Sequence, residues 1–307
     1  AREKIRSACG CPEADVFFLV GGTQTNATVI SALLRSYEGV VAAVSGHIST
    51  HEAGAIELGG HKVLTLPAHE GKFTAADLRE LLVRCETDEA RDHLVRPGMV
   101  YVSQPTESGT LYSLRELREI SAVCREYGLP LDLDGARLAY ALACPSNDVS
   151  LQELAELCDV FYIGGTKCGA LFGEAVVIPK RGFIPHFFTI MKQHGALLAK
   201  GWLLGLQFDV LFTDGLYLKV GKAAIAAAGR IRATLREYGY QLCWDTPANQ
   251  VFVILENAQM KRLAESVEFS FWEKYDATHT VIRLAASWAT TEEDTEKLLV
   301  VLKENVV

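Results

Sequence analysis

The sequence predicts an α/β protein built on a mainly parallel sheet, and three observations support this fold class. Short apolar runs rich in Val, Ile and aromatic residues alternate with amphipathic stretches of helical length. The hydrophobic content of 49% and charged content of 22% are ordinary for a folded protein. A chain of 307 residues can bury a substantial core and form one large domain plus a smaller one.

The first half of the chain reads as strands and helices in alternation. An apolar run at 16–20 predicts a strand that leads into Gly21 and Gly22, and Thr23 opens the helix that follows. Glycines before a helix N-terminus let backbone N–H groups approach an anion, so this turn is a weak predictor of a phosphate site. Further strands are expected at 39–44, 62–66, 100–103 and 131–134, and helices at 23–37, 50–58, 74–86, 113–127 and 150–157.

The second half predicts a smaller unit joined by a long helix. Strands at 159–164 and 174–178 precede a long, mostly helical passage over 183–214 and a linking helix over 215–239. Strands near 241–244, 250–255 and 280–285 and helices at 258–267 and 292–304 follow. We therefore expect a large domain over 1–214 and a small α+β domain over 215–307.

Lys167 lies between two strand-like apolar runs. An ammonium group loses hydration in such a place, which lowers its pKa and makes the amine a nucleophile toward carbonyl groups. A lysine that forms a Schiff base needs this property. The alternative is an ordinary exposed hairpin, and Lys167 alone does not separate the two.

Asp134 ends a short strand in which Leu131 and Leu133 alternate with Asp132 and Asp134. Open α/β sheets bind ligands at the carboxyl ends of their strands. A carboxylate there can keep a ring nitrogen protonated, and a protonated pyridine is the electron sink of pyridoxal phosphate chemistry. Arg137 follows closely enough to face the same pocket. Taken alone, the position of Asp134 favours a turn in which this residue caps the next helix.

Five motifs occur in a fixed order: Gly21-Gly22-Thr23-Gln24-Thr25-Asn26, the segment 47–55, Asp134-Gly135-Ala136-Arg137, Thr166-Lys167 and Ile282-Arg283-Leu284. Together they resemble the threonine aldolase and β-eliminating lyase family of fold type I pyridoxal phosphate enzymes, over nearly the whole chain. The resemblance implies an aspartate-aminotransferase-like fold with a large, mainly parallel-sheet domain and a small C-terminal α+β domain. No single motif is decisive, but five in the right order are highly specific.

The resemblance also implies pyridoxal 5′-phosphate as cofactor and assigns its site, with no metal. The implied cofactor-binding residues are Gly22, Thr23, His47, Asp134, Arg137, Thr166 and Lys167. Lys167, His47 and Asp134 are the implied catalytic residues, with His47 stacked on the cofactor ring. Arg137 and Arg283 would bind the substrate α-carboxylate, although an internal Asp or Glu is an alternative partner for Arg283.

The implied reaction is retro-aldol cleavage of a β-hydroxy-α-amino acid, threonine or allo-threonine, to glycine and acetaldehyde. Two alternatives stay open: β-elimination to a keto acid and ammonia, with Lys167 removing the Cα proton, and a non-catalytic scaffold that retains the fold. The loop 104–110 departs from the better-known threonine aldolases, because Pro105 is expected where they carry a histidine. His47 is then the imidazole expected to accept the hydroxyl proton, and His51 is expected to point elsewhere.

Composition also restricts partners and location. The net charge of −8 without a basic block argues against nucleic acid, and no apolar run approaches the roughly 20 residues of a membrane span. Eight cysteines without CxxC or zinc-like spacing suit a reducing cytoplasm. The family implies a small amino-acid substrate and a homodimer or homotetramer with its active site at the subunit interface. His194 and Lys200 either reach toward a cofactor across that interface or are solvated helix positions.

The chain begins at Ala1 in the middle of a predicted helix, without a start Met or a signal peptide. The resemblance implies an additional N-terminal segment that helps to close the active site. We therefore expect the N-terminus to be incomplete.

Overall fold

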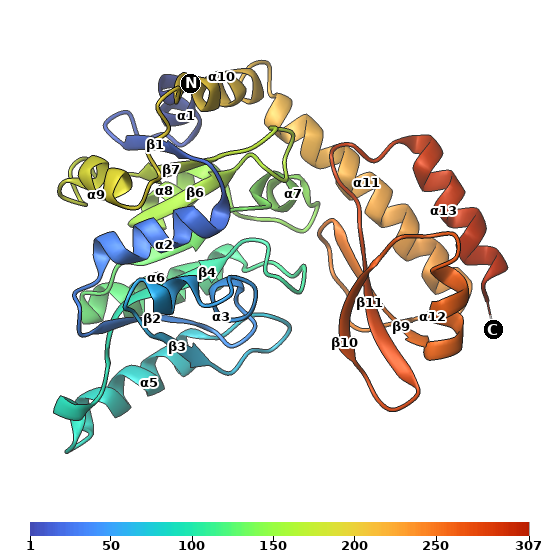
Figure 1. The fold of residues 1–307 in the computed structure, drawn as a ribbon, viewed down its shortest axis with the longest axis horizontal. Coiled ribbons are helices and arrows are strands. Elements are labelled where there is room, and N and C mark those ends of the chain that lie inside the picture. The colour runs from blue at the N-terminus through green and yellow to red at the C-terminus, as the bar shows by residue number, and fades with distance from the viewer. Residues whose placement is uncertain (307) are drawn as a thin grey trace.

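The computed structural model describes residues 1–306 and contains two sheets with helices packed around them (Figure 1). The larger sheet has seven strands in the order β1-β7-β6-β5-β4-β2-β3. These are β1 (Asp15–Leu19), β2 (Glu38–Ala43), β3 (Val63–Leu66), β4 (Arg96–Ser103), β5 (Leu131–Asp134), β6 (Val160–Gly164) and β7 (Glu174–Ile178). The pairs from β3 to β6 are parallel, and β7 is antiparallel to both β6 and β1. The predicted mainly parallel sheet is confirmed.

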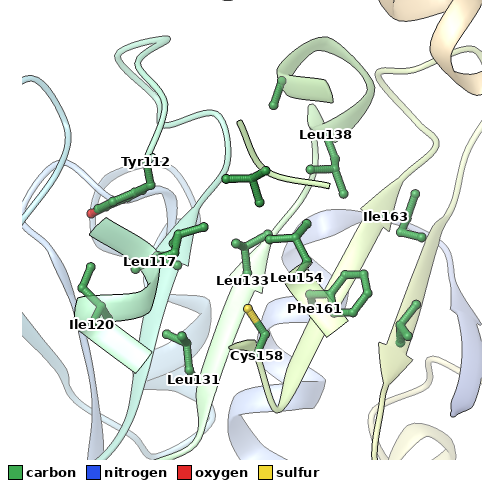
Figure 2. Packing of buried hydrophobic residues seen from close by; sticks show 14 of the residues in the cluster. Tyr112, Leu117, Ile120, Leu131, Leu133, Leu138, Leu154, Cys158, Phe161 and Ile163 are labelled. Carbon is green, nitrogen blue, oxygen red and sulfur yellow. The ribbon is translucent and has the colours of Figure 1, made fainter. Parts of the chain in front are cut away.

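Helices cover both faces of this sheet, because its central strands are apolar on both sides. One face packs against α5 (Ala75–Thr87), α6 (Leu114–Tyr127), α7 (Leu138–Ala143) and α8 (Leu151–Leu157). Figure 2 shows Leu131 and Leu133 of β5 among the side chains of α6 and α8 on this face. The other face packs against α2 (Gly22–Leu33) and α9 (Phe187–Gln193). Since side chains alternate along a strand, Asp132 and Asp134 point to the α2 face.

The predicted helix starts at Thr74, Ser113 and Ser150 are confirmed by side-chain capping. In each case the hydroxyl oxygen accepts a backbone N–H three residues on, and the carboxylate there accepts the N–H of the capping residue. Thr291 begins α13 (Glu292–Glu304) in the same way. These capping boxes satisfy donors that the first turn of a helix leaves unpaired, so the sequence marks these boundaries sharply.

The second sheet is antiparallel, in the order β10-β11-β9-β8. Its strands are β8 (Gln241–Leu242), β9 (Gln250–Glu256), β10 (Ser270–Lys274) and β11 (His279–Ala285), with α12 (Asn257–Leu263) and α13 packed against them. The long helix α11 (Leu216–Glu237) runs from α7, beside the large sheet, to the small sheet (Figure 1). No helix within residues 1–306 is both long and apolar enough to cross a membrane. The division at 214/215 stays a prediction.

Several expected boundaries differ from the structure. The helix expected at 50–58 is two short helices, α3 (His47–Thr50) and α4 (Ala55–Leu58), separated by left-handed residues at Ala53 (φ 50°) and Gly54 (φ 74°). The helix after Gly22 ends at Leu33 rather than near residue 37. The passage 183–214 contains α9 and α10 (Trp202–Leu211) with an irregular segment between them. Sequence patterns missed β10 and α7, while α1 (Arg2–Ala8) and the 3₁₀ turn Arg91–His93 complete the described elements.

Candidate active site

A cavity of about 170 Å³ opens where β4, β5 and β6 end and α2 begins. All seven residues that the sequence predicts as cofactor-binding line it: Gly22, Thr23, His47, Asp134, Arg137, Thr166 and Lys167. The carboxyl edge of a parallel sheet gathers these residues because successive strands end at the same side. Motifs separated by more than 140 positions in the chain (167 − 22 = 145) therefore meet in one pocket.

A second cavity of about 270 Å³ adjoins the first. Its lining combines residues of both sheets and their loops: His47, His51, Glu107, Arg137, Phe271, Trp272 and Arg283. Three of these, His47, Glu107 and Arg137, also line the first cavity, so the two spaces lie on either side of these side chains. The expectation that His51 points elsewhere was wrong, because its ring lies 5.6 Å from that of His47 and lines this cavity.

Asp134 is a buried carboxylate with a full set of donors. Its Oδ1 accepts the backbone N–H of Ala136 at 2.9 Å, and its Oδ2 accepts the Tyr101 hydroxyl at 2.5 Å and Asn26 Nδ2 at 3.3 Å. Burial alone would raise the pKa of Asp134, but the hydroxyls of Tyr101 and Tyr162 and the amide of Ala136 stabilise the anion more, so the pKa lies below its usual value. The carboxylate is therefore charged at neutral pH.

Lys167 lies in the loop between β6 and β7 rather than within a strand. Backbone hydrogen bonds from Gly165 and Thr166 to the Gly173 carbonyl close this loop, and the Tyr140 hydroxyl donates to the Lys167 carbonyl oxygen. Burial lowers the pKa of the Lys167 amine, and the nearby Arg137 guanidinium lowers it further. The expected desolvated amine is present, and the exposed-hairpin alternative is wrong.

The turn before α2 has the shape of an anion site. The helix begins at Gly22, and the N–H groups of a first helical turn have no partner within the helix. The helix dipole favours negative charge at this end. A side chain at Gly22 would place its Cβ 3.1 Å from the Tyr162 hydroxyl, which would crowd the pocket at the start of α2.

His47 contacts a buried carboxylate, that of Glu52. Its Nδ1 lies 2.7 Å from Oε1 of Glu52, whose side chain has no solvent exposure. Asn26 Nδ2 donates to the same oxygen at 2.7 Å, and its second contact is Asp134. The imidazole and the Asp134 carboxylate are therefore joined by two intervening side chains.

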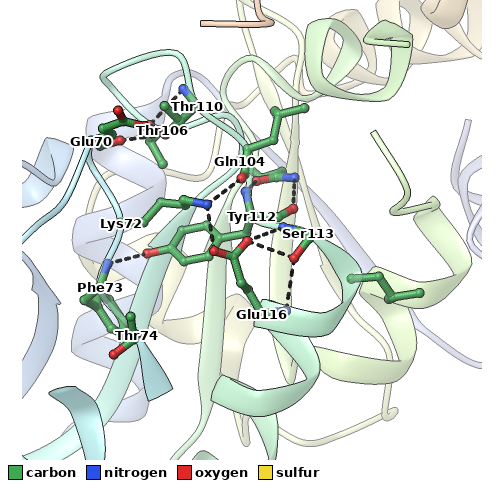
Figure 3. A network of polar contacts seen from close by, with 12 residues as sticks. Glu70, Lys72, Phe73, Thr74, Gln104, Thr106, Thr110, Tyr112, Ser113 and Glu116 are labelled. Atoms are coloured by element: carbon green, nitrogen blue, oxygen red, sulfur yellow. Dashed lines mark hydrogen bonds and ion pairs between the residues drawn. The ribbon is translucent and has the colours of Figure 1, made fainter. Parts of the chain in front are cut away.

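Glu107 is an ionisable group in the loop 104–110, where the better-known threonine aldolases carry a histidine. Its Oε1 accepts the Ser103 hydroxyl at 2.8 Å, and burial, followed by the neighbouring Asp134 charge, raises its pKa. Figure 3 shows how the loop is fixed: Gln104 exchanges two hydrogen bonds with the backbone of Tyr112, and the Thr110 hydroxyl donates to the Glu70 carbonyl oxygen. Pro105 lines the first cavity, and its correspondence to the histidine of the better-known threonine aldolases stays a prediction.

Arg283 has neutral partners only. Its Nη1 donates to Gln250 Oε1 at 3.0 Å and its Nη2 to Ser270 Oγ at 3.2 Å, while its guanidinium lies 5.6 Å from the centre of the Trp272 ring. Nε is buried without a partner among the described residues. No carboxylate of residues 1–306 pairs with this charge, so the alternative of an internal Asp or Glu partner is wrong.

Several side chains of the site were missed, and their signals in the sequence were weak. Tyr101 ends up beside Asp134 because β4 and β5 are neighbours, which no local pattern reveals. Glu174 opens β7, accepts the Gly165 N–H at 3.0 Å, and has its pKa raised by burial to about 8. Trp272 belongs to the strand that was not predicted. For the contact between His47 and Glu52, the one signal in the sequence is that the two residues lie five positions apart.

His194 and Lys200 lie outside both cavities of this chain. His194 Nε2 lies 3.1 Å from the Ser31 hydroxyl, and Lys200 is exposed. Neither contacts the predicted site residues.

Comparison with known proteins places this site in a family. The chain matches the beta-eliminating lyase family over residues 1–267. A low specificity L-threonine aldolase of Pseudomonas sp. is 31% identical over 293 residues, covering 93% of this chain and 82% of that protein. A second low specificity L-threonine aldolase, from Pseudomonas aeruginosa, is 32% identical over 82% of this chain and 72% of its own length. The chain belongs to the beta-eliminating lyase family.

Solved structures agree with this membership. The threonine aldolase of Leishmania major superimposes with a TM-score of 0.95 at 44% identity, over 99% of this chain and 88% of that one. The aspartate aminotransferase of Thermus thermophilus, at 16% identity and a TM-score of 0.69, shares the fold. The expected aspartate-aminotransferase-like fold is confirmed.

As a member of this lyase family the chain is an enzyme that uses pyridoxal phosphate, and the residues of the first cavity fit that group. A charged, buried Asp134 is available for a pyridine nitrogen, and Lys167 supplies a desolvated amine. The absence of a side chain at Gly22 leaves room for phosphate at the N-terminus of α2. The pyridine nitrogen, the carbonyl and the phosphate of the cofactor would each have a suitable group of the protein to bind.

Proposed function

We propose that this protein cleaves a β-hydroxy-α-amino acid, L-threonine or L-allo-threonine, by a retro-aldol reaction to glycine and acetaldehyde. The observation that carries the proposal is the second cavity, which adjoins the cofactor pocket and contains two guanidinium groups, Arg137 and Arg283. The names of the relatives from Pseudomonas and Leishmania major support threonine as the substrate.

Lys167 and Asp134 are proposed to hold the cofactor from opposite sides. Because burial lowers the pKa of Lys167, its amine would be available in the neutral form to bind the cofactor carbonyl. The charged Asp134 keeps the ring nitrogen protonated. Bound pyridoxal phosphate then supplies an electron sink for the pair that remains on Cα when a bond to it breaks. Gly22 and Thr23 bind the phosphate, and Thr166 lines the same pocket.

Arg137 and Arg283 are proposed to bind the substrate carboxylate. A guanidinium fits a carboxylate with two parallel hydrogen bonds, which fixes the plane of the substrate as well as its position. Arg283 has only Gln250 and Ser270 as internal partners, so its charge is available to an anion in the cavity. This orientation determines which bond of Cα lies over the cofactor.

His47 is proposed to cover the cofactor ring and to accept the β-hydroxyl proton. It lines both cavities, and the contact of Nδ1 with Glu52 leaves Nε2 for the substrate. As the O–H bond breaks, the proton passes to Nε2, the oxygen becomes the carbonyl oxygen of acetaldehyde, and the Cα–Cβ bond breaks. The electron pair of that bond stays on Cα until a proton added there gives glycine.

The second candidate is β-elimination, which the description of the family favours. In that reaction Lys167 would take the Cα proton, and a substituent would leave from Cβ. The products separate the candidates, because retro-aldol cleavage gives glycine and an aldehyde, whereas elimination gives a keto acid and ammonia.

The test is to screen β-hydroxy amino acids with the pyridoxal phosphate form of the enzyme and to measure all four products. We expect glycine and acetaldehyde in equal amounts from L-threonine or L-allo-threonine. Ammonia and a keto acid without glycine would replace this proposal with elimination. A protein that shows the cofactor absorbance but converts none of these substrates would contradict both.

We also propose that the enzyme acts in the cytoplasm as a homodimer or homotetramer. All eight cysteines are free, as expected in a reducing compartment. The exposed side chains of α10 include Trp202, Leu203, Leu206 and Val210, an apolar surface that a second copy would cover. Light scattering of the purified protein measures the assembly, and a monomer would contradict it. Cell fractionation tests the compartment. We also propose that the large domain comprises residues 1–214 and the small domain residues 215–307.

A further inference from the structure

Glu52 is a buried carboxylate that the reaction as proposed does not use. Its side chain has no solvent exposure, its Oε1 contacts His47 Nδ1 and Asn26 Nδ2 at 2.7 Å each, and its Oε2 has no partner within residues 1–306. Burying a carboxylate is costly unless hydrogen bonds or charges compensate. A side chain that is retained at such a cost next to a reacting group needs an explanation.

The contact with Glu52 determines which nitrogen of His47 carries a proton. A carboxylate oxygen at 2.7 Å can accept a hydrogen bond from Nδ1, which favours the tautomer with the proton on Nδ1. In the neutral ring Nε2 then has a free lone pair. His47 lines both the cofactor cavity and the adjoining one, so the basic nitrogen is offered on the substrate side.

The break between α3 and α4 makes this contact possible. In a continuous helix, residues five apart are turned about 140° from each other around the axis, so His47 and Glu52 would not meet. α3 ends at Thr50, and His51 leaves the helical path with φ −126° and ψ 15°, so Glu52 is not held at its helical position and its carboxylate reaches His47. The feature that the sequence-based helix prediction missed is the one that builds the pair.

Asn26 extends the pair to the cofactor pocket. The Nδ2 group of Asn26 has two hydrogens, and both are donated to carboxylate oxygens. One goes to Glu52 at 2.7 Å and the other to Asp134 at 3.3 Å. The three side chains are nearly or fully buried. Asn26 therefore links the orientation of the His47–Glu52 pair to the carboxylate at the cofactor nitrogen.

We infer that Glu52 is a positioning residue that fixes the tautomer and orientation of His47, so that Nε2 accepts the β-hydroxyl proton. This inference rests on the proposed function. After the transfer, Nε2 carries the substrate proton, Nδ1–H still donates to Glu52, and the carboxylate stabilises the positive imidazolium. Glu52 itself neither gains nor loses a proton in the step.

The first experiment measures the tautomer in the wild-type enzyme. Nitrogen-15 NMR of the histidine rings distinguishes a protonated Nδ1 from a protonated Nε2, and the signals of His47 are those that disappear in His47→Phe. We expect the neutral ring to carry its proton on Nδ1. A proton on Nε2 would overturn the inference, and this measurement needs no Glu52 variant and no turnover.

The second experiment is a double-mutant cycle of Glu52→Gln and His47→Phe. Glu52→Gln keeps the shape but removes the charge, and we expect kcat for threonine to fall by about 10²-fold, the lower range for general-base catalysis, with little change in KM. Because Glu52 acts through His47, the double variant should be no slower than His47→Phe alone. Multiplied losses, or a Glu52→Gln enzyme with unchanged kcat, would contradict the role.

Asp276→Asn is the matched control, because Asp276 also contacts a histidine, His279, at 3.0 Å but lies at an exposed turn of the small sheet. We expect unchanged kcat and KM for this variant. Thermal unfolding and cofactor absorbance show whether Glu52→Gln is folded and loaded. If the wild-type enzyme releases no glycine, the proposed function fails; if it does and the cycle is additive, only the role of Glu52 fails.

Discussion

Asp132 and Asp134 lie two residues apart on β5 and point to the same face of the sheet, yet their surroundings are opposite. Asp134, at the carboxyl end of the strand, accepts hydrogen bonds from Tyr101, Asn26 and the Ala136 amide. Asp132, one pleat deeper, is equally buried, and neither of its oxygens has a partner within the described residues. Burial, followed by the charge of Asp134, raises the pKa of Asp132 well above its usual value, whereas the pKa of Asp134 is lowered.

The difference teaches how the position of a carboxyl group along one strand decides whether the charged form is stabilised. A group that must stay charged in a dry pocket needs donors from several elements, and only the edge of the sheet, where loops converge, supplies them. Inside the sheet the pKa of the same residue type is raised, because nothing compensates the lost hydration. The predictions below test this contrast between the partnered edge and the unpartnered interior.

The largest effect is expected at the edge, for Lys167→Ala. We predict that it abolishes turnover, because no other buried amine lines the cofactor cavity. Reduction of the wild-type enzyme with borohydride, followed by peptide mapping, should place the cofactor label on Lys167. A label on any other lysine would disprove the assignment.

Asp134→Asn should come next, with a loss of about 10²-fold or more in kcat and retention of some cofactor. The amide still forms hydrogen bonds but carries no charge to keep the ring nitrogen protonated. Asp132→Asn is the matched control, because it makes the same change two residues away outside both cavities. We expect its kcat to stay within a few-fold of wild type. Similar losses in both variants would remove the distinction between edge and interior.

How much of this contrast the sequence could reveal depends on the range of the interactions. Asp134 ends one strand and Lys167 comes soon after another, and both strands are visible as short apolar runs in the sequence. The helix starts are also visible, because each capping residue and its carboxylate partner lie three positions apart; these capping residues are Thr74, Ser113 and Ser150. Both kinds of feature were therefore predictable. The partners of Asp134 were not, because Tyr101 and Asn26 come from other elements and meet it only through the strand order.

The same limit explains the errors around His47. The apolar spacing over 50–58 is that of a helix, and only the tertiary contacts of Glu52 and the left-handed residues at 53 and 54 break it. The sequence did not predict β10 of the small sheet. The residues of this strand are largely exposed, and buried and exposed positions alternate only weakly along it. The family resemblance supplied the roles of Gly22 and Arg283, which local patterns leave open.

A paired prediction compares His47 and Glu107, two of the three ionisable groups that line both cavities. His47→Phe keeps a ring that can stack, so we expect about a 10²-fold loss of threonine cleavage, with the cofactor spectrum and any β-elimination nearly unchanged. Glu107→Gln should cost less than 10-fold at neutral pH, because burial raises the pKa of Glu107 and Ser103 already donates to it. The reverse order would identify Glu107 as the proton acceptor. Equal losses of cleavage and elimination in His47→Phe would show that His47 acts only by positioning the ring.

The smallest and most specific effect concerns the stability of Asp132→Asn. Asp132 has a raised pKa in the folded state, so the folded protein holds a proton that the unfolded chain releases above pH ~4. The contribution of this group to stability is complete below the unfolded pKa and is lost as the pH rises toward the folded pKa, by up to about 1.4 kcal/mol per pH unit. An asparagine has no such dependence.

Urea unfolding of the two proteins between pH 4.5 and 8 therefore should give nearly equal stabilities at the acid end. The curves should separate as the pH rises, with Asp132→Asn the more stable protein at pH 8. The reason is the unpartnered carboxyl group: the wild-type protein must either keep it protonated or ionise it without a donor. Curves that stay parallel would mean that Asp132 gains a partner when ionised, and the interior of β5 would then resemble its edge.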